Sequence, residues 1–130
     1  MIVLDASVVV ELLNHSPAQR WIGARLATAQ RPFHAPHLID AEVVQVLRRF
    51  AAAGAVTARG GGDALAALAL LPLRRHVHAP LLARAWELRA NITAYDALYV
   101  ALAERLGATL LTRDARLARA PGIQAPVEVL

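Results

Sequence analysis

Apolar residues alternate along the chain between short β-branched runs and longer stretches with helical spacing. The run Ile2–Leu4 has the composition of a buried strand, and the apolar positions of Ala6–Leu13 predict a helix that Asp5 or Ser7 could cap. The chain therefore begins with a strand, a carboxylate and a helix.

The same pattern predicts the remaining elements. Helices are expected at residues 17–29, 37–53, 80–90, 94–106 and 114–119, and strands at 33–35, 73–78, 108–112 and 127–129. Gly54 can close the long central helix, and Thr57 can cap a further helix. Three consecutive glycines at 60–62 should loosen the first turns of that helix and form a flexible loop.

Strands that alternate with helices favour a parallel sheet, because parallel strands need crossover connections. We therefore predict an α/β fold, a three-layer α/β/α sandwich with a central, mostly parallel sheet. With 130 residues and no repeat or linker, the chain is expected to form one domain over residues 1–130.

Composition limits the class of protein. Although 57% of the residues are hydrophobic, the apolar run from Ala64 to Pro72 is far shorter than the ~20 residues of a membrane-spanning helix. Asp5 interrupts the first apolar run, so no signal peptide is expected. The absence of cysteine excludes disulfides and thiolate chemistry, and agrees with a cytoplasmic protein that has no membrane partner.

The charge is basic, with 14 arginine or lysine residues against 10 acidic ones, for a net charge of +4. All the basic residues are arginine. Such a balance is compatible with a polyanionic partner such as nucleic acid, but an arginine bias can also reflect genome composition.

Four acidic residues lie within apolar segments, where an unpaired charge costs several kcal/mol or more. They are Asp5, Glu42, Asp96 and Asp114. Asp5 and Asp114 follow predicted strands, so both should lie at the carboxyl edge of the sheet, where open α/β sheets bind ligands. Taken singly, each could instead cap a helix, and Asp96 could form a capping box with Thr93.

Glu42 does not fit a capping role because it lies in the middle of a predicted helix, at the edge of its apolar stripe. An ion pair with Arg48, Arg49 or a distant arginine is the structural alternative. The four acids together favour a metal site. Carboxylate oxygens suit a hard divalent ion, Mg²⁺ or Mn²⁺, whose coordination shell substrate phosphate oxygens complete.

Other catalytic arrangements are weakly supported. The five histidines lack the spacing of zinc ligands on one helix face. Ser7 has no serine-hydrolase elbow around it, and the glycine run lacks the GK[ST] ending of a phosphate-binding loop.

Three segments are similar to the PIN domain family, specifically to the VapC-like toxins of bacterial toxin–antitoxin pairs: MIVLDASVVVELL, LIDAEVVQVLRR and TAYDALYVALAERLGATLLTRDARL. This resemblance implies an endoribonuclease that depends on Mg²⁺ or Mn²⁺. Asp5, Glu42, Asp96 and Asp114 match the acidic cluster of the family, with Asp5 and Asp96 as the expected direct ligands. Ser7 and Thr112 match its supporting polar positions.

The implied reaction is RNA hydrolysis, in which one or two divalent ions activate a water molecule for in-line attack on phosphorus. Near the acids, Arg113 and Arg116 are expected to contact the RNA backbone, and a solvated face is the alternative for both. The resemblance also implies a homodimer and a cognate antitoxin, which can join it in a larger toxin–antitoxin complex.

Two alternatives remain. An aspartyl-phosphate phosphatase or receiver domain also places aspartate after the first strand, but these families generally have a second adjacent acid and a lysine. Here the motif is Asp5-Ala6-Ser7, and the chain has no lysine. The second alternative is a catalytically inactive PIN-like module that binds RNA or a protein, and the intact set of four acids argues against it.

Overall fold

A five-stranded sheet runs through the middle of the protein, whose computed structural model describes residues 1–130. In spatial order the strands are β3 (Leu73–His76), β2 (Phe33–Pro36), β1 (Ile2–Leu4), β4 (Thr109–Thr112) and β5 (Val127–Val129). Every neighbouring pair is parallel. The central strand β1 is buried along its whole length, as expected for a β-branched run that is covered on both faces.

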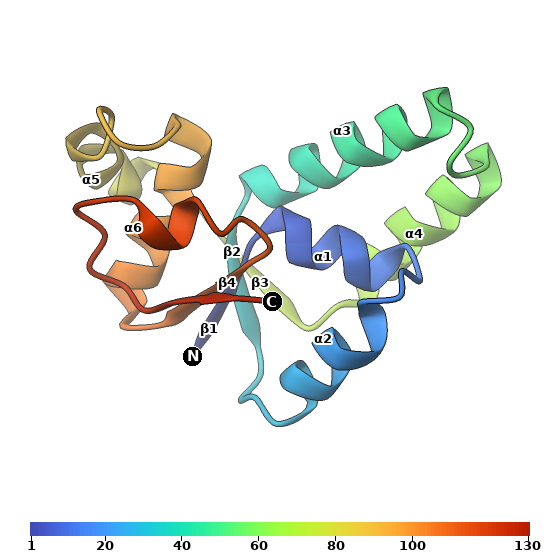
Figure 1. Cartoon of the computed structure of the whole chain (residues 1–130), viewed down its shortest axis with the longest axis horizontal. Coiled ribbons are helices and arrows are strands. Elements are labelled where there is room, and N and C mark those ends of the chain that lie inside the picture. Colours follow the sequence, from blue (N-terminus) through green and yellow to red (C-terminus); the bar gives the residue numbers. More distant parts are fainter.

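Helices cover the sheet on two sides. They are α1 (Ala6–Leu13), α2 (Gln19–Ala27), α3 (Leu38–Ala52), α4 (Ala58–Leu70), α5 (Leu82–Glu87) and α6 (Ala94–Leu106), with short 3-10 turns η1 (Ala79–Leu81) and η2 (Leu117–Arg119). In Figure 1, α1 to α4 lie on one side of the strands, and α5 and α6 lie on the other. The predicted three-layer sandwich is confirmed, and its sheet is wholly parallel. None of the helices has both the length and the apolar character that crossing a bilayer requires.

The strand order reverses at β1, because the chain passes to β2 on one side and reaches β4 on the other. Such a switch leaves a crevice at the carboxyl ends of the two diverging strands, where open α/β sheets bind ligands. Leu4 of β1 pairs with Leu111 of β4, and the Asp5 amide then donates to the Leu111 carbonyl at 3.0 Å. Asp5 and Thr112 therefore lie side by side at the carboxyl edge of the sheet.

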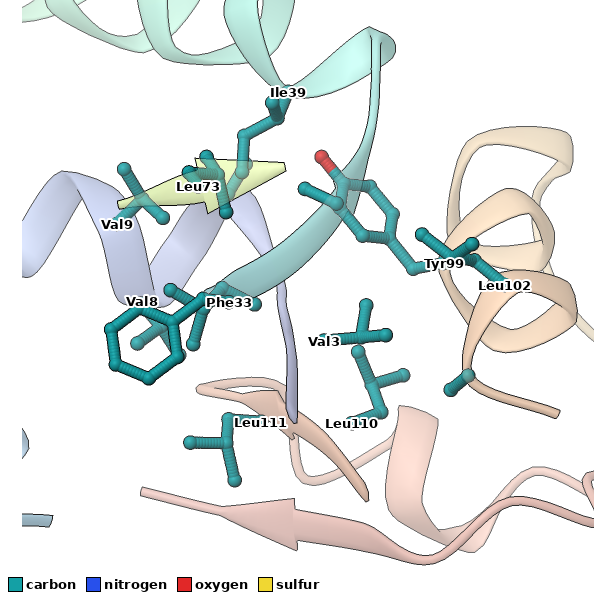
Figure 2. Packing of buried hydrophobic residues seen from close by; sticks show 14 of the residues in the cluster. Val3, Val8, Val9, Phe33, Ile39, Leu73, Tyr99, Leu102, Leu110 and Leu111 are labelled. Atoms are coloured by element: carbon teal, nitrogen blue, oxygen red, sulfur yellow. The ribbon is translucent and has the colours of Figure 1, made fainter. Parts of the chain in front are cut away.

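The helix α6 fills one face of the sheet. Its residues 97–103 are all buried, because the helix packs between the strands and α5. Several of them are alanines, whose small side chains allow the helix to lie close to the sheet. Tyr99 is the largest and is 1% exposed. Figure 2 shows it crossing the core, with its hydroxyl pointing towards the start of α3, the helix that carries Ile39.

The glycines at 60–62 belong to a helix, so the prediction of a flexible loop there is wrong. The Thr57 side chain caps α4 by accepting a hydrogen bond from the Gly60 amide at 3.0 Å. Each glycine costs a helix about 1 kcal/mol relative to alanine. Ala64 and Leu68, which are buried on the inner face of α4, hold this helix against its neighbours despite that cost.

Several predicted boundaries also differ. The helix expected at 80–90 instead begins as the turn η1, which contains Pro80, and continues as the shorter α5, which ends at Glu87. The strand expected at 73–78 ends at His76, and the ring of His78 accepts a hydrogen bond from the Leu38 amide at 3.0 Å instead. The helix expected at 114–119 is only the turn η2.

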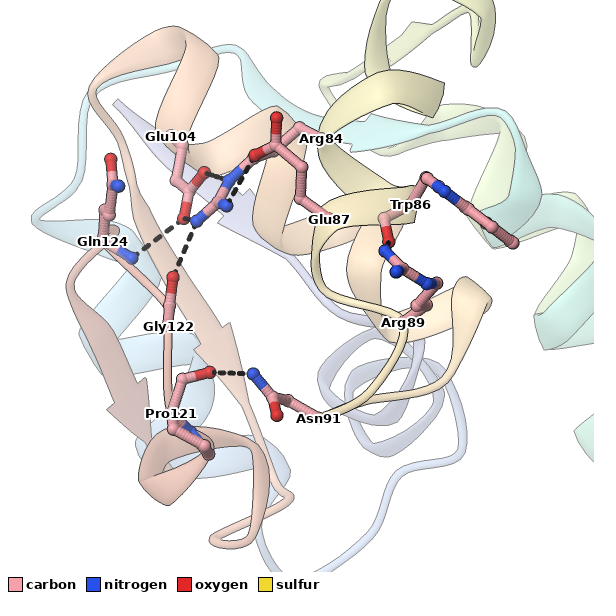
Figure 3. Close-up of polar contacts among 9 residues, drawn as sticks. All are labelled: Arg84, Trp86, Glu87, Arg89, Asn91, Glu104, Pro121, Gly122 and Gln124. Carbon is pink, nitrogen blue, oxygen red and sulfur yellow. Dashed lines mark hydrogen bonds and ion pairs between the residues drawn. The ribbon is translucent and has the colours of Figure 1, made fainter.

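Arg84 ties the C-terminal segment to α5 and α6 (Figure 3). Its guanidinium donates to both carboxylate oxygens of Glu104, at 2.6 and 3.1 Å, and to the Gly122 carbonyl at 2.6 Å. Nearby, the Asn91 side-chain amide donates to the Pro121 carbonyl at 2.9 Å. The Asn91 bond ties the loop between α5 and α6 to the C-terminal segment, close to the start of α6, which carries Asp96.

Candidate metal centre

Asp5 lies at the N-terminal end of α1, but its side chain does not cap that helix. Its Oδ2 instead accepts two hydrogen bonds, from Ser7 Oγ at 2.7 Å and from Thr112 Oγ1 at 2.6 Å. The capping explanation for Asp5 is therefore wrong. The residues predicted as supporting polar groups both bind the carboxylate of Asp5.

The backbone of the turn after β4 fixes the direction of these two bonds. The Arg113 amide donates to Ser7 Oγ at 3.0 Å, and the Asp114 amide donates to Thr112 Oγ1 at 3.0 Å. A hydroxyl has one proton, and each hydroxyl here already accepts from an amide, so each directs its proton to Asp5. Oδ2 of Asp5 thus accepts two hydrogen bonds, and no protein group donates to Oδ1.

Glu42 lies in α3 and accepts a hydrogen bond from the buried hydroxyl of Tyr99 at 2.5 Å. No ion pair of the structure includes Glu42, Asp5 or Asp96, so the predicted ion pair of Glu42 with an arginine is not formed. Burial raises the pKa of Glu42, and the neighbouring charges of Asp5 and Asp96 raise it further, whereas the Tyr99 hydrogen bond lowers it. Its charge therefore lacks compensation in the protein.

Asp96 lies in the first turn of α6, which Thr93 caps by accepting from the Asp96 amide at 3.1 Å. The side chain of Asp96 is not needed to close that helix end. Burial raises the pKa of Asp96, and the carboxylates of Asp5 and Asp114 add to this effect, whereas the Thr93 hydroxyl and the charge of Arg116 lower it. The net effect is a raised pKa, so the charge of Asp96 is only partly compensated.

Asp114 differs from the other three acids, because arginine compensates its charge. Its Oδ1 accepts from the Arg116 amide at 2.8 Å, and its Oδ2 lies 3.1 Å from the Arg116 guanidinium. These hydrogen bonds hold the pKa of Asp114 below its usual value. Asp114 caps no helix, because the N-cap residue of η2 is Arg116, and the Asp114 side chain instead closes a local turn before η2. The Arg116 side chain is 92% exposed, so it is free to move away.

The four carboxylates line two hollows at the carboxyl edge of the sheet. Asp96 and Asp114 line one of about 500 Å³, and Asp5 and Glu42 line another of about 470 Å³. No three acidic or histidine side chains lie close enough together to hold an ion between them as they stand. This geometry fits Mg²⁺ or Mn²⁺, which bind through one or two carboxylates and complete their shell with water and phosphate oxygens. The raised pKa values of Glu42 and Asp96 agree, because a divalent cation would supply the missing positive charge.

Comparison with known proteins identifies the family. The sequence matches the family described as "PIN domain" over residues 2–123. The chain belongs to the PIN domain family. Ribonuclease VapC9 from Mycobacterium tuberculosis is 41% identical over 131 aligned positions, which cover 100% of this chain and 98% of that protein. Ribonuclease VapC3 from the same organism is 44% identical over 119 positions, covering 92% of this chain and 86% of the relative. The resemblance to PIN domains that the sequence predicted is confirmed.

The solved structures agree on the PIN fold. VapBC2 from Rickettsia felis, crystallised with a DNA fragment from its promoter, contains a chain that superposes with a TM-score of 0.71 at 19% identity. The superposition covers 99% of this chain and 98% of that one.

Sequence reasoning missed one residue of this PIN domain site, Tyr99. Its position three after Asp96, on the buried side of α6, resembles that of an ordinary core aromatic residue. Only the spatial meeting of α6 with α3 brings its hydroxyl to Glu42. A tyrosine where the neighbouring core residues have no polar atom was the available signal, since a buried hydroxyl needs a partner.

Proposed function

We propose that this chain is an endoribonuclease that hydrolyses RNA phosphodiester bonds and serves as the toxin of a type II toxin–antitoxin pair. The names of relatives with 41% and 44% identity, both VapC ribonucleases, support this assignment. The observation that carries it is the carboxylate of Asp5 directly after β1, one oxygen of which two hydroxyls hold, with Glu42, Asp96 and Asp114 lining the two hollows at the same edge of the sheet.

The proposed cofactor is a divalent ion, Mg²⁺ or Mn²⁺, held by Asp5 and Asp96. Glu42 and Asp114 would bind it as further ligands or orient its water. When bound, such an ion activates water and stabilises charge on the phosphate oxygens. Ser7 and Thr112 orient Asp5, and the Tyr99 hydroxyl holds Glu42. These contacts preorganise the acids before substrate arrives, as hydrogen bonds to metal ligands commonly do.

Arg116 is proposed to contact the RNA backbone. Its guanidinium is solvent-exposed, lies at the rim of the larger hollow and pairs only with Asp114. A phosphate can therefore replace the carboxylate as its partner at little cost, since exposed ion pairs contribute about 0–1 kcal/mol. RNA contact by Arg113 stays a prediction, and the structure gives the side chain of Arg113 other partners, described below.

The proposed partners follow from the same assignment. The whole chain, residues 1–130, would act as one PIN domain in the cytoplasm, as a homodimer that a cognate antitoxin binds and inhibits. Coexpression with the protein encoded next to it should yield a stable complex that does not cleave RNA. Size-exclusion chromatography with light scattering would measure the mass of the free protein and of this complex.

The decisive experiment replaces single carboxylates by amides. Asp5→Asn and Asp96→Asn should each abolish cleavage of RNA by the purified protein in Mn²⁺ or Mg²⁺, while the circular dichroism spectrum stays that of the wild type. Asp63→Asn is the matched control, because Asp63 is an exposed aspartate of α4 away from the crevice. A chelator should stop the wild-type reaction. Undiminished cleavage by either site variant, or cleavage that resists the chelator, would refute the proposal.

A further inference from the structure

Arg113 follows the last residue of β4, and its side chain has three partners, none of which is a site acid. Its guanidinium donates to the Leu130 carbonyl at 3.2 Å and lies 4.0 Å from a carboxylate oxygen of Glu11. It also stacks over the ring of Trp21, 5.3 Å from the ring centroid. These partners come from α1, α2 and the end of the chain, so one side chain joins three separate segments.

The backbone of the same residue takes part in the candidate metal centre. The Arg113 amide donates to Ser7 Oγ, and the next amide donates to Thr112 Oγ1, both at 3.0 Å. These two bonds direct the hydroxyl protons to Asp5 Oδ2. The peptide groups on either side of the Arg113 Cα therefore determine how Asp5 is held, and its side chain is what anchors them.

We propose that Arg113 is a positioning residue of the metal centre, an assignment that rests on the proposed function. Its guanidinium fixes the turn after β4, and the amides of this turn hold Ser7 and Thr112 on one oxygen of Asp5. The other oxygen of Asp5 stays available to the ion. Without the anchor, the turn would gain conformational freedom, and the hydroxyls would no longer be restricted to Asp5.

The contacts favour this role over RNA binding. The Arg113 side chain is 35% exposed and has a carbonyl, a carboxylate and an aromatic face as partners, whereas Arg116 is 92% exposed with one partner. A phosphate would compete with these three partners for the Arg113 guanidinium. Arg116 would give up a single exposed pair.

The test compares Arg113→Ala with Arg119→Ala. Arg119 is an exposed arginine of η2 whose side chain makes no hydrogen bond or ion pair, so its variant matches the change in charge and length. Arg113→Ala should weaken Mn²⁺ binding, measured by titration calorimetry without RNA, by about tenfold, as loss of second-shell support commonly does. It should also speed hydrogen exchange of the Asp114 amide in the metal-free protein, and Arg119→Ala should change neither value.

Kinetics separate positioning from RNA contact. A positioning role predicts a lower kcat for Arg113→Ala with little change in KM for RNA, whereas an RNA contact predicts a higher KM that depends less on salt. If Arg113→Ala does not fold, Trp21→Leu can replace it, because it removes the aromatic ring on which the Arg113 guanidinium stacks. This variant should also lower kcat and weaken Mn²⁺ binding.

The assignment would be overturned if Arg113→Ala binds Mn²⁺ and exchanges the Asp114 amide as the wild type does. If Arg113→Ala does not fold, the same result in Trp21→Leu would overturn it. If the wild type binds Mn²⁺ but does not cleave RNA, the proposed function fails, and the binding and exchange data still decide the role of Arg113.

Discussion

Replacing Tyr99 by phenylalanine should destabilise the protein at neutral pH, and by an amount that shrinks as the pH falls. The ring is 1% exposed, and Phe would fill the same space, so the change removes only the hydroxyl that donates to Glu42 at 2.5 Å. This bond has a carboxylate acceptor. Hydrogen bonds to charged groups contribute about 1.5–3 kcal/mol to stability.

The structure places the expected loss at the low end of that range. Glu42 is only half-buried, so water can replace the hydroxyl on the carboxylate side. A loss of about 1.5 kcal/mol follows. For a chain of 130 residues this corresponds to a fall in Tm of about 6 °C.

The pH dependence identifies the acceptor. The Tyr99 bond lowers the pKa of Glu42, so the pKa of Glu42 is higher in the variant than in the wild type. The advantage of the wild type is thus full above the pKa of the variant, and decreases as the pH falls through both values. Thermal unfolding of the metal-free proteins, followed by circular dichroism between neutral and mildly acidic pH, measures this difference.

Tyr95→Phe supplies the control, because Tyr95 is on the same helix but is 61% exposed, and its hydroxyl makes no hydrogen bond within the protein. It should leave Tm within about 2 °C of the wild type, as surface substitutions usually do. An equal loss in both variants would refute the reasoning. So would a Tyr99→Phe effect that stays constant with pH, since the acceptor would then not be a titrating carboxylate.

Two further predictions concern charge. Glu42→Gln should stabilise the metal-free protein at neutral pH, because burial and like charges raise the pKa of Glu42 and so make its ionised form unfavourable. In thermal melts, this gain in stability should disappear at a pH low enough to protonate Glu42. A variant that is less stable than the wild type at neutral pH would contradict the prediction. Arg84→Met should lower the free energy of unfolding in urea by about 2 kcal/mol, since it removes the charged hydrogen bonds to Glu104, whose side chain is 12% exposed, and such bonds contribute about 1.5–3 kcal/mol. Arg105→Met, which removes an exposed arginine of α6 without an ion pair, should cost at most about 0.5 kcal/mol.

The sequence predicted the layers of the fold because strand and helix patterns here are strong and local. The run Ile2–Leu4 and the periodic stretch Ala94–Leu106 appear in the structure with the predicted bounds. The glycines at 60–62 were mispredicted because local propensity favours a loop, whereas the Thr57 cap and the buried Leu68 come from the surroundings. Tertiary packing overrode propensity at this point.

In the candidate site, too, local patterns predicted some features and tertiary packing decided the others. The positions of Asp5 and Asp114 follow from where strands end, so the sequence predicted that these two residues share one edge of the sheet. What each carboxylate contacts depends on residues far away in the chain, such as Thr112 for Asp5 and Tyr99 for Glu42. Tyr99 lies 57 positions from Glu42, and Thr112 lies 107 positions from Asp5, so no local sequence pattern predicts these contacts.

The central place of β1 determines when the site can form during synthesis. Strand β1 is made first, yet one of its two neighbours in the sheet is β4, more than a hundred residues later. Until Thr112 and Asp114 have left the ribosome exit tunnel, Asp5 lacks one of its two hydroxyl partners and the crevice lacks one wall. A chain that is truncated before β4 should therefore lack the proposed nuclease activity, because the last strands to be made complete the site.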